Sequence, residues 1–192
     1  RQYPSIQAAA AAIVNLDAQL CLPKGTEHFV SDVHGEHEAF RHVLRNASGS
    51  LKRKIDELFG DELSVEARRD LATLIYYPEE KLELVLKAVQ DDAAWHRTTL
   101  ARLVRLFRVV SGKYLRHRVR AFLPRDRAGI VEELLYADTG TGDKDAYYST
   151  LTETMITTGS ARAVIVALAE LLQRLAVARL HVIGDVYDRG PG

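Results

Sequence analysis

The chain has 192 residues, and its 26 Lys plus Arg balance 26 Asp plus Glu, so the formal net charge is zero. A neutral chain excludes a globally basic nucleic-acid binder and a globally acidic tail. With 47% hydrophobic and 27% charged residues, the composition is that of a globular protein rather than a disordered one. The single cysteine, Cys21, excludes an intramolecular disulfide, and no apolar run reaches the roughly 18 residues of a membrane span. We therefore expect a cytoplasmic chain with no leader, no membrane partner and no nucleic-acid partner.

The first quarter of the chain predicts a helix, a short buried strand, a turn and a second helix. The helical segments are marked by apolar periodicity, and Pro23 and Gly49 each follow the end of one of them. The expected ranges, in this order, are residues 5–20, 28–32, 33–35 and 36–47.

The middle of the chain predicts almost only helices, and the chain then returns to a strand. Ser64 suits an N-cap and Pro78 a first helical position. The expected helices are residues 51–59, 64–76, 78–89, 93–110, 128–136, 145–157 and 161–177. Residues 179–184 predict a second strand and residues 185–191 a turn-rich loop. Two strands do not complete a domain sheet, so we expect a truncated α/β core whose remaining residues lie downstream.

Charge is distributed unevenly along the helical stretch. Residues 56–92 hold eleven acidic and four basic side chains, a net charge of −7, whereas residues 102–127 hold nine basic and one acidic, a net charge of +8. Arg102, Arg105 and Arg108 recur every three residues and share one helical face. The pattern favours a solvated face or a contact between oppositely charged helices. It disfavours an RNA or anion site, because no aromatic side chains are interleaved to stack on bases.

Two short polar motifs follow the two predicted strands. The tetrapeptide DVHG (residues 32–35) comes after the first strand, and GDVYDRG (residues 184–190) comes after the second. In open α/β sheets, ligands bind at the carboxyl ends of the strands. The two motifs in this order favour one shared site over two unrelated strand ends whose aspartates only form hydrogen bonds.

The residue types in these motifs suit a two-metal hydrolytic site. Asp32 and His34 lie two residues apart, and a turn after the strand lets both point at one ion. Asp185, on the neighbouring strand, is placed to bridge two ions roughly 3.5–4 Å apart. Carboxylate oxygen and imidazole nitrogen suit Mn²⁺, Fe²⁺ or Zn²⁺. Arg189 is suited to bind phosphate through its planar guanidinium, and Asp188 to orient a histidine ligand or a general acid.

Both motifs together resemble the first two metal-binding blocks of the calcineurin-like metallophosphoesterases. Asp32 and Asp185 are 153 positions apart, whereas protein phosphatases of that superfamily place one short βα unit between these blocks. Four further segments are LATLIYYPEEKL at 71–82, EELLY at 132–136, DAYY at 145–148 and LHVIGD at 180–185. These segments are similar to class III (Firmicutes-type) fructose-1,6-bisphosphatases, and the resemblance covers nearly the whole chain.

The resemblance implies an α/β fold with a metallophosphoesterase-type β-sandwich core flanked by helices. Residues 1–192 form the N-terminal part of one catalytic domain, and residues 50–158 form an all-helical insertion between the motif-bearing strands. The implied reaction is hydrolysis of fructose 1,6-bisphosphate to fructose 6-phosphate and phosphate in gluconeogenesis, by a longer cytoplasmic enzyme. The superfamily's later Asn and His ligands are absent from this sequence. We therefore expect an incomplete site and an inactive isolated fragment.

By the same resemblance, Asp32, His34 and Asp185 match metal positions, with manganese as the usual ion and other divalent ions as alternatives. Asp188 and Arg189 match the positions that support catalysis, and Arg189 also matches the phosphate-binding position. The implied partner is a small-molecule sugar bisphosphate, and a homo-oligomer is left open.

Two other functions stay open from the residues alone. The same site suits a phosphatase that acts on a phosphoprotein or a nucleotide. The second function is that of a non-catalytic helical binding module on a degenerate phosphatase core, with residues 102–127 as its contact surface. A substrate panel distinguishes the first from a sugar bisphosphatase, and the presence of the downstream ligands distinguishes the second.

Overall fold

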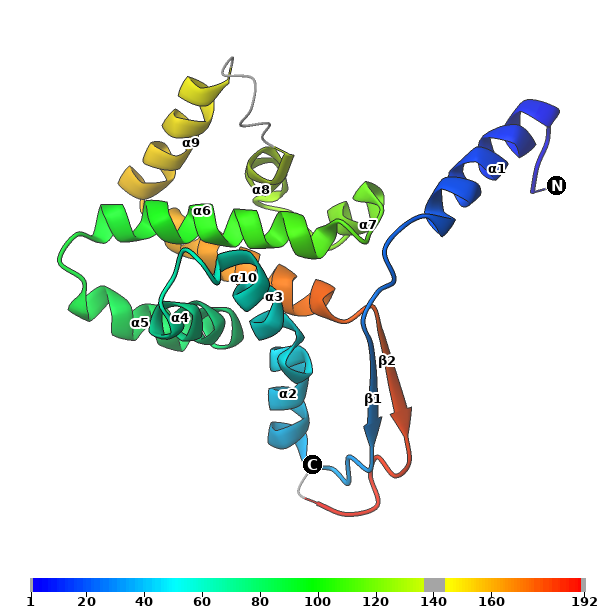
Figure 1. Ribbon diagram of the computed structural model, residues 1–192, viewed down its shortest axis with the longest axis horizontal. Helices are drawn as coiled ribbons and strands as arrows, with labels where there is room; N and C mark the ends of the chain where they lie inside the picture. Colours follow the sequence, from blue (N-terminus) through cyan, green and yellow to red (C-terminus); the bar gives the residue numbers. More distant parts are fainter. Residues whose placement is uncertain (1, 137–143, 191–192) are drawn as a thin grey trace.

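The computed structural model describes residues 2–136 and 144–190, and Figure 1 shows their arrangement. The described residues form a mainly helical body and one two-stranded parallel sheet, which confirms the α/β class expected from the sequence. Pro191, the last residue of the expected loop, lies outside the described residues. The elements are α1 (Ile6–Leu20), β1 (Glu27–Ser31), α2 (His37–Asn46), the 3₁₀ turn η1 (Ala47–Gly49), α3 (Ser50–Phe59), α4 (Val65–Tyr76), α5 (Pro78–Ala88), α6 (Asp92–Ser111), α7 (Arg116–Arg120), α8 (Ala128–Tyr136), α9 (Asp145–Thr157), α10 (Ala161–Ala176) and β2 (Arg179–Ile183).

Local capping explains where several helices begin. Ser64 Oγ accepts a hydrogen bond from the Ala67 amide at 3.1 Å, and Asp91 Oδ1 accepts one from the Ala94 amide at 2.8 Å. Each bond satisfies a backbone N–H that has no partner within the helix. Pro78 occupies the first position of α5, where its missing N–H costs nothing. The expected helices and strands are confirmed to within one residue at each end, whereas α7 was not predicted.

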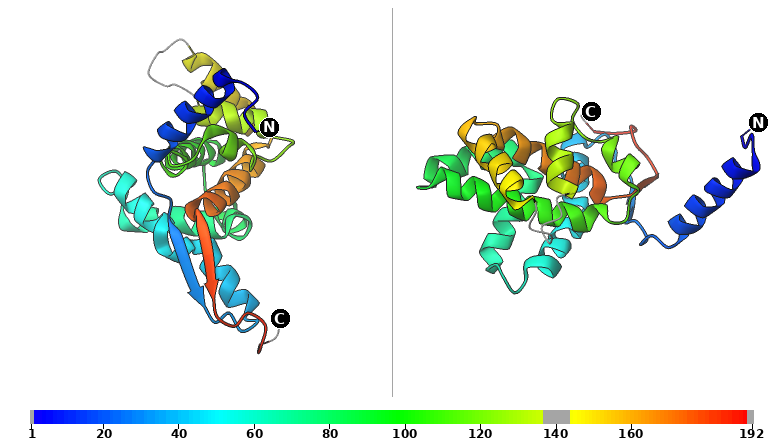
Figure 2. Two further views of the ribbon diagram at one scale, coloured as in Figure 1. Left: turned by 90° about the vertical axis from the view of Figure 1, so that its right-hand side faces the viewer. Right: turned by 90° about the horizontal axis from the view of Figure 1, so that it is seen from above.

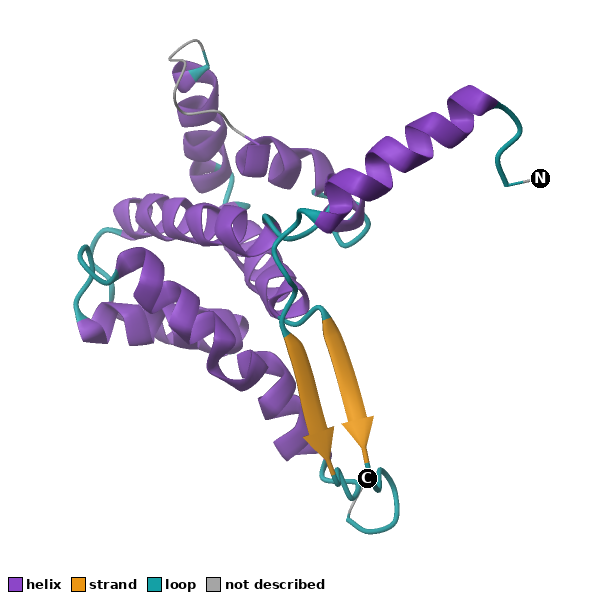
Figure 3. Ribbon diagram, turned by 45° about the vertical axis from the view of Figure 1, so that its right-hand side comes forward, coloured by secondary structure: helices purple, strands orange, loops and turns teal. Residues whose placement is uncertain are grey.

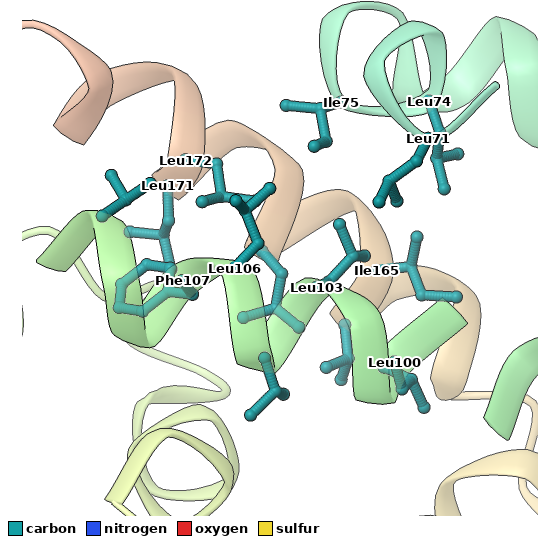
Figure 4. Packing of buried hydrophobic residues seen from close by; sticks show 14 of the residues in the cluster. Leu71, Leu74, Ile75, Leu100, Leu103, Leu106, Phe107, Ile165, Leu171 and Leu172 are labelled. Carbon is teal, nitrogen blue, oxygen red and sulfur yellow. The ribbon is translucent and has the colours of Figure 1, made fainter. Parts of the chain in front are cut away.

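The hydrophobic core lies where α6 and α10 cross and where α4 packs against α10. Figure 4 shows side chains of these three helices pointing toward one another. Leu103, Leu106 and Phe107 of α6 are at most 1% exposed, as are Leu168 and Leu172 of α10. Burying one such side chain stabilises the fold by roughly 1.5–3 kcal/mol. The core therefore extends into α10, beyond residue 158.

Side chains of the basic stretch contact neighbouring segments at several points. Arg105 donates two hydrogen bonds to the carboxylate of Glu62, at 2.6 and 2.7 Å, and this contact lowers the pKa of Glu62. Arg120 also pairs with Glu132, while Arg108 donates to backbone carbonyls of α8. The contact between Arg105 and Glu62 joins the basic stretch to the turn between α3 and α4, so the contact between two oppositely charged helices stays a prediction.

The two strands bring together segments that are far apart in the sequence. They pair in parallel, with Val30 opposite Val182. The backbone N–H of Ala178 donates to Thr26 O at 2.7 Å just before the strands begin. Helices α2 to α10 all lie between β1 and β2 along the chain. Parallel pairing sets the carboxyl ends of both strands at the same end of the sheet.

The expectation that the first strand is buried is wrong for the described residues. Phe29 is 61% exposed, and on β2 Val182 is 42% and Ile183 60% exposed. Figures 1 and 3 show the strands extending away from the helical body, and α2 runs alongside the sheet. The apolar residues of a strand are buried only when a second layer packs on the sheet. The sequence therefore predicted the position of the strand correctly, but its burial depends on a second layer that the described residues do not form.

The N-terminal helix α1 stands apart from the core. It has no buried residue, and Ile6, Ile13 and Leu20 are 85%, 66% and 84% exposed. The right-hand view of Figure 2 shows the helix projecting from the body. Its stability therefore comes from local terms, such as its Ala-rich sequence and the bond from the Ala8 amide to Ser5 Oγ.

Among the described residues, no single helix is long and apolar enough to cross a membrane. Helices α9 and α10 meet the length and composition criteria only when taken as a pair, and that pair is bent by 109°.

Candidate metal centre

The first motif leaves β1 through a strained turn. Asp32 and His34 both have left-handed backbone conformations, with φ of 47° and 51°. Side chains other than glycine rarely adopt this region, and such strain concentrates at functional sites. Gly35 continues the turn with φ of 69°, a conformation that costs glycine little. The turn places the Asp32 and His34 side chains at the carboxyl end of the sheet, as the sequence predicts.

Backbone hydrogen bonds join this turn to the loop after β2. The His34 amide donates to Asp185 O at 3.1 Å, and the Gly35 amide donates to Val186 O at 2.7 Å. In the other direction, the Asp185 amide donates to the Asp32 carboxylate at 3.3 Å. These bonds extend the parallel pairing past the strands. They hold the two motifs side by side, although 153 positions separate Asp32 from Asp185.

The His34 imidazole lies between Asp188 and Arg189. Its Nδ1 is 2.6 Å from Asp188 Oδ1, and its Nε2 is 3.5 Å from a terminal nitrogen of Arg189. The hydrogen bond from His34 is the main cause that holds the pKa of Asp188 below its ordinary value, and Arg189 acts in the same direction. A carboxylate only accepts, so the proton of the shorter contact is on Nδ1. Nε2, on the other side of the ring, faces Arg189 and is the atom that could hold a metal.

Three side chains of this centre converge closely enough to hold one ion. One donor atom from each of His34, Asp185 and Asp188 lies within 4.8 Å of the others. Asp32 is outside this group, and its carboxylate instead accepts the hydrogen bond from the Asp185 backbone. The structure thus brings all five predicted site residues into one cluster. Imidazole nitrogen and carboxylate oxygen form a donor set that suits a divalent first-row metal.

Two glycines of the second motif allow the loops to approach each other this closely. A Cβ at Gly184, where φ is 116°, would lie 2.4 Å from Asp32 Oδ1. A Cβ at Gly190, where φ is 89°, would lie 2.1 Å from His34 O. Gly190 had no predicted role. Its place directly after Arg189 in a turn-rich loop was the available signal.

Replacing Gly190 with alanine is expected to weaken Mn²⁺ binding by the full-length protein by about 10- to 100-fold, the usual effect of disturbing groups that orient metal ligands. The added methyl group forces the loop away from His34. The matched control is Gly129→Ala in α8, where an added Cβ meets nothing within 4 Å. Titration with Mn²⁺ measures both variants, and equal affinities would contradict this account of the loop.

Imidazole and carboxylate donors at the ends of parallel strands, with an arginine beside them, define a candidate site of the metal-dependent hydrolase class. The whole chain, residues 1–192, matches the family model described as Firmicute fructose-1,6-bisphosphatase. The chain belongs to this family, which confirms the resemblance found in the sequence.

Curated relatives agree with the family. The chain is 54% identical over 192 residues to a fructose-1,6-bisphosphatase class 3 of Clostridium botulinum (strain Loch Maree / Type A3). It is also 54% identical over 191 residues to the protein of that name from Clostridium novyi (strain NT). The alignments cover 100% of this chain but only 29% of each relative, so the chain spans less than a third of their length. No solved structure shows significant similarity to the chain.

Proposed function

We propose that this chain forms the N-terminal part of a two-metal phosphomonoesterase that hydrolyses fructose 1,6-bisphosphate to fructose 6-phosphate and phosphate. The observation that carries the proposal is the convergence of His34, Asp185 and Asp188 at one point, in a chain of the Firmicute fructose-1,6-bisphosphatase family. The name of the curated relatives supports the substrate, and the arginine beside the cluster supports phosphate chemistry.

Asp32, His34 and Asp185 are the proposed metal ligands, with Mn²⁺ as the proposed ion. Their oxygen and nitrogen donors suit Mn²⁺ and equally suit other divalent ions, so availability selects among them. A bound pair of ions supplies an activated water and stabilises the charge of the phosphoryl group. The ligands that complete the site belong to the part of the relatives that this chain does not cover.

The other two residues act on the ligands and the substrate. Asp188 accepts the Nδ1 proton of His34, which would fix the ring orientation and leave Nε2 as the nitrogen that could hold an ion. Arg189 has a side chain that is 72% exposed, and its guanidinium lies next to both Asp188 and His34. It is therefore placed to bind a substrate phosphate through two parallel N–H groups.

The proposed domain organisation has residues 1–192 as the N-terminal part of one catalytic domain. In it, residues 50–158 are a helical insertion, and downstream strands complete a metallophosphoesterase-type β-sandwich. The exposed faces of β1 and β2 support further layers on this sheet. The proposed setting is gluconeogenesis in the cytoplasm, with a sugar bisphosphate as partner and neither nucleic acid nor membrane.

The test is phosphate release from fructose 1,6-bisphosphate by the full-length protein, first with Mn²⁺ and then with excess EDTA. We expect turnover that EDTA abolishes and that added Mn²⁺ restores. A phosphopeptide and a nucleoside monophosphate serve as competing substrates, and we expect neither to be hydrolysed at a comparable rate.

Each other outcome points to a defined alternative. Metal-dependent release from the phosphopeptide or the nucleotide, but not from the sugar bisphosphate, would contradict the proposed substrate and support the proposed metal site. Release that persists in EDTA overturns the metal centre. No release from any substrate overturns the enzymatic assignment and favours a binding role.

A further inference from the structure

A cleft of about 500 Å³ lies between the C-terminal half of α2, the end of α10 and the start of β2. Figure 1 shows these segments at the junction between the helical body and the sheet. The cleft is outside the candidate metal centre, which lies at the opposite, carboxyl end of the strands. Its volume falls in the range of roughly 300–1,000 Å³ that is typical of small-molecule sites.

Four arginines line this cleft from two sides. Arg41 and Arg45 lie one turn apart on α2, and Arg174 and Arg179 lie on the opposite wall. Glu170 is the single carboxylate among the lining residues. A cleft lined by one sign of charge concentrates its electric field and attracts counter-ions. Guanidinium groups are also the side chains best suited to bind phosphate through paired hydrogen bonds.

Most of this charge is not neutralised within residues 2–136 and 144–190. Over these residues, Arg41, Arg45 and Arg174 form no ion pair with a carboxylate. Arg179 has a distant partner in Glu27, at 3.9 Å. Arg45 is held in place by the ring of Tyr77, whose centroid is 5.3 Å from the guanidinium carbon. At least one of the arginines is therefore positioned before any ligand binds.

The remaining lining residues indicate what kind of anion fits. Leu44, Val177 and Leu180 contribute apolar surface to the lining of the cleft. An inorganic anion contacts the arginines only, whereas an organic ligand also covers this surface. We propose that the cleft binds a small organic anion that carries at least two phosphate groups, one for each pair of arginines.

The experiment measures the binding of inorganic pyrophosphate to the full-length protein by calorimetry, in EDTA so that no metal contributes. The wild-type protein should bind pyrophosphate saturably with one site. The variant Arg41→Gln/Arg174→Gln should bind at least tenfold more weakly, since each charge-assisted hydrogen bond contributes more than a tenfold change in affinity. Both side chains are exposed, so we expect unchanged thermal unfolding.

The matched control is Arg53→Gln/Arg162→Gln, which removes the same charge from exposed positions outside the cleft. We expect its affinity to change less than twofold. Absence of saturable binding, unchanged binding by the cleft variant, or equal loss in both double variants would each overturn the proposal. Catalysis is not measured, so failure here leaves the proposed phosphatase activity untouched.

Discussion

Replacing Asp185 with asparagine in the full-length protein is expected to lower phosphate release by about 10²–10³-fold or more. Asparagine has nearly the same shape as aspartate but lacks the charge, so metal affinity falls and transition-state charge loses its stabilisation. The backbone bonds of Asp185 to His34 and Asp32 do not involve its carboxylate, so the loop keeps its position. Phosphate release and metal content, measured on the same sample, check the prediction.

Asp61→Asn is the control for this experiment. Asp61 is exposed and forms no ion pair with any residue in the described part of the chain. We expect wild-type activity and metal content from this variant. If circular dichroism shows that both variants are folded, activity of Asp185→Asn within a factor of ten of wild type would show that Asp185 is not a metal ligand.

Replacing Phe107 with alanine is expected to lower the free energy of unfolding by about 3–5 kcal/mol. Phe107 is 1% exposed and lies in the contact between α6 and α10 (Figure 4). Its removal leaves a cavity that rigid neighbouring helices fill only in part. Urea unfolding followed by circular dichroism measures the change.

Val109→Ala, on the same helix, provides the comparison. Val109 is 45% exposed, and we expect a change within about 0.5 kcal/mol. A similar effect of both substitutions would mean that the contact between α6 and α10 is not the centre of the core. Because the helical body positions both strands, we expect Phe107→Ala to weaken metal binding as well.

The sequence predicted the helices well because their ends carry strong local signals. Ser64 and Pro78 determine where α4 and α5 begin, and both signals are visible without any tertiary structure. By contrast, α7 is only five residues long and rich in arginine, so it shows no apolar periodicity. It exists because Val119 packs into the core, a contact between distant parts of the chain.

The candidate site residues could be named from the sequence because the two motifs each follow a strand. Their geometry was not, since it depends on pairing across the sheet. The sequence did not indicate that Asp32 accepts a hydrogen bond from the Asp185 backbone, or that Gly190 lies against His34. Asp188 was expected to orient a histidine, and its contact with His34 is consistent with that role. Metal binding by His34 stays a prediction.

The parallel pair has a consequence during synthesis. Asp32 and Asp185 are 153 positions apart, and ribosomes add about 5–20 residues per second, so β1 emerges ~8–30 s before its partner. For that time its edge and the exposed Phe29 are open to pairing with other nascent chains. Helices α3 to α6 pack against α10, which ends at Ala176, directly before β2 begins at Arg179. The core and the parallel pair therefore both wait for the same late segment of the chain, and the metal centre, which needs residues 184–190, is complete only after that segment has been made.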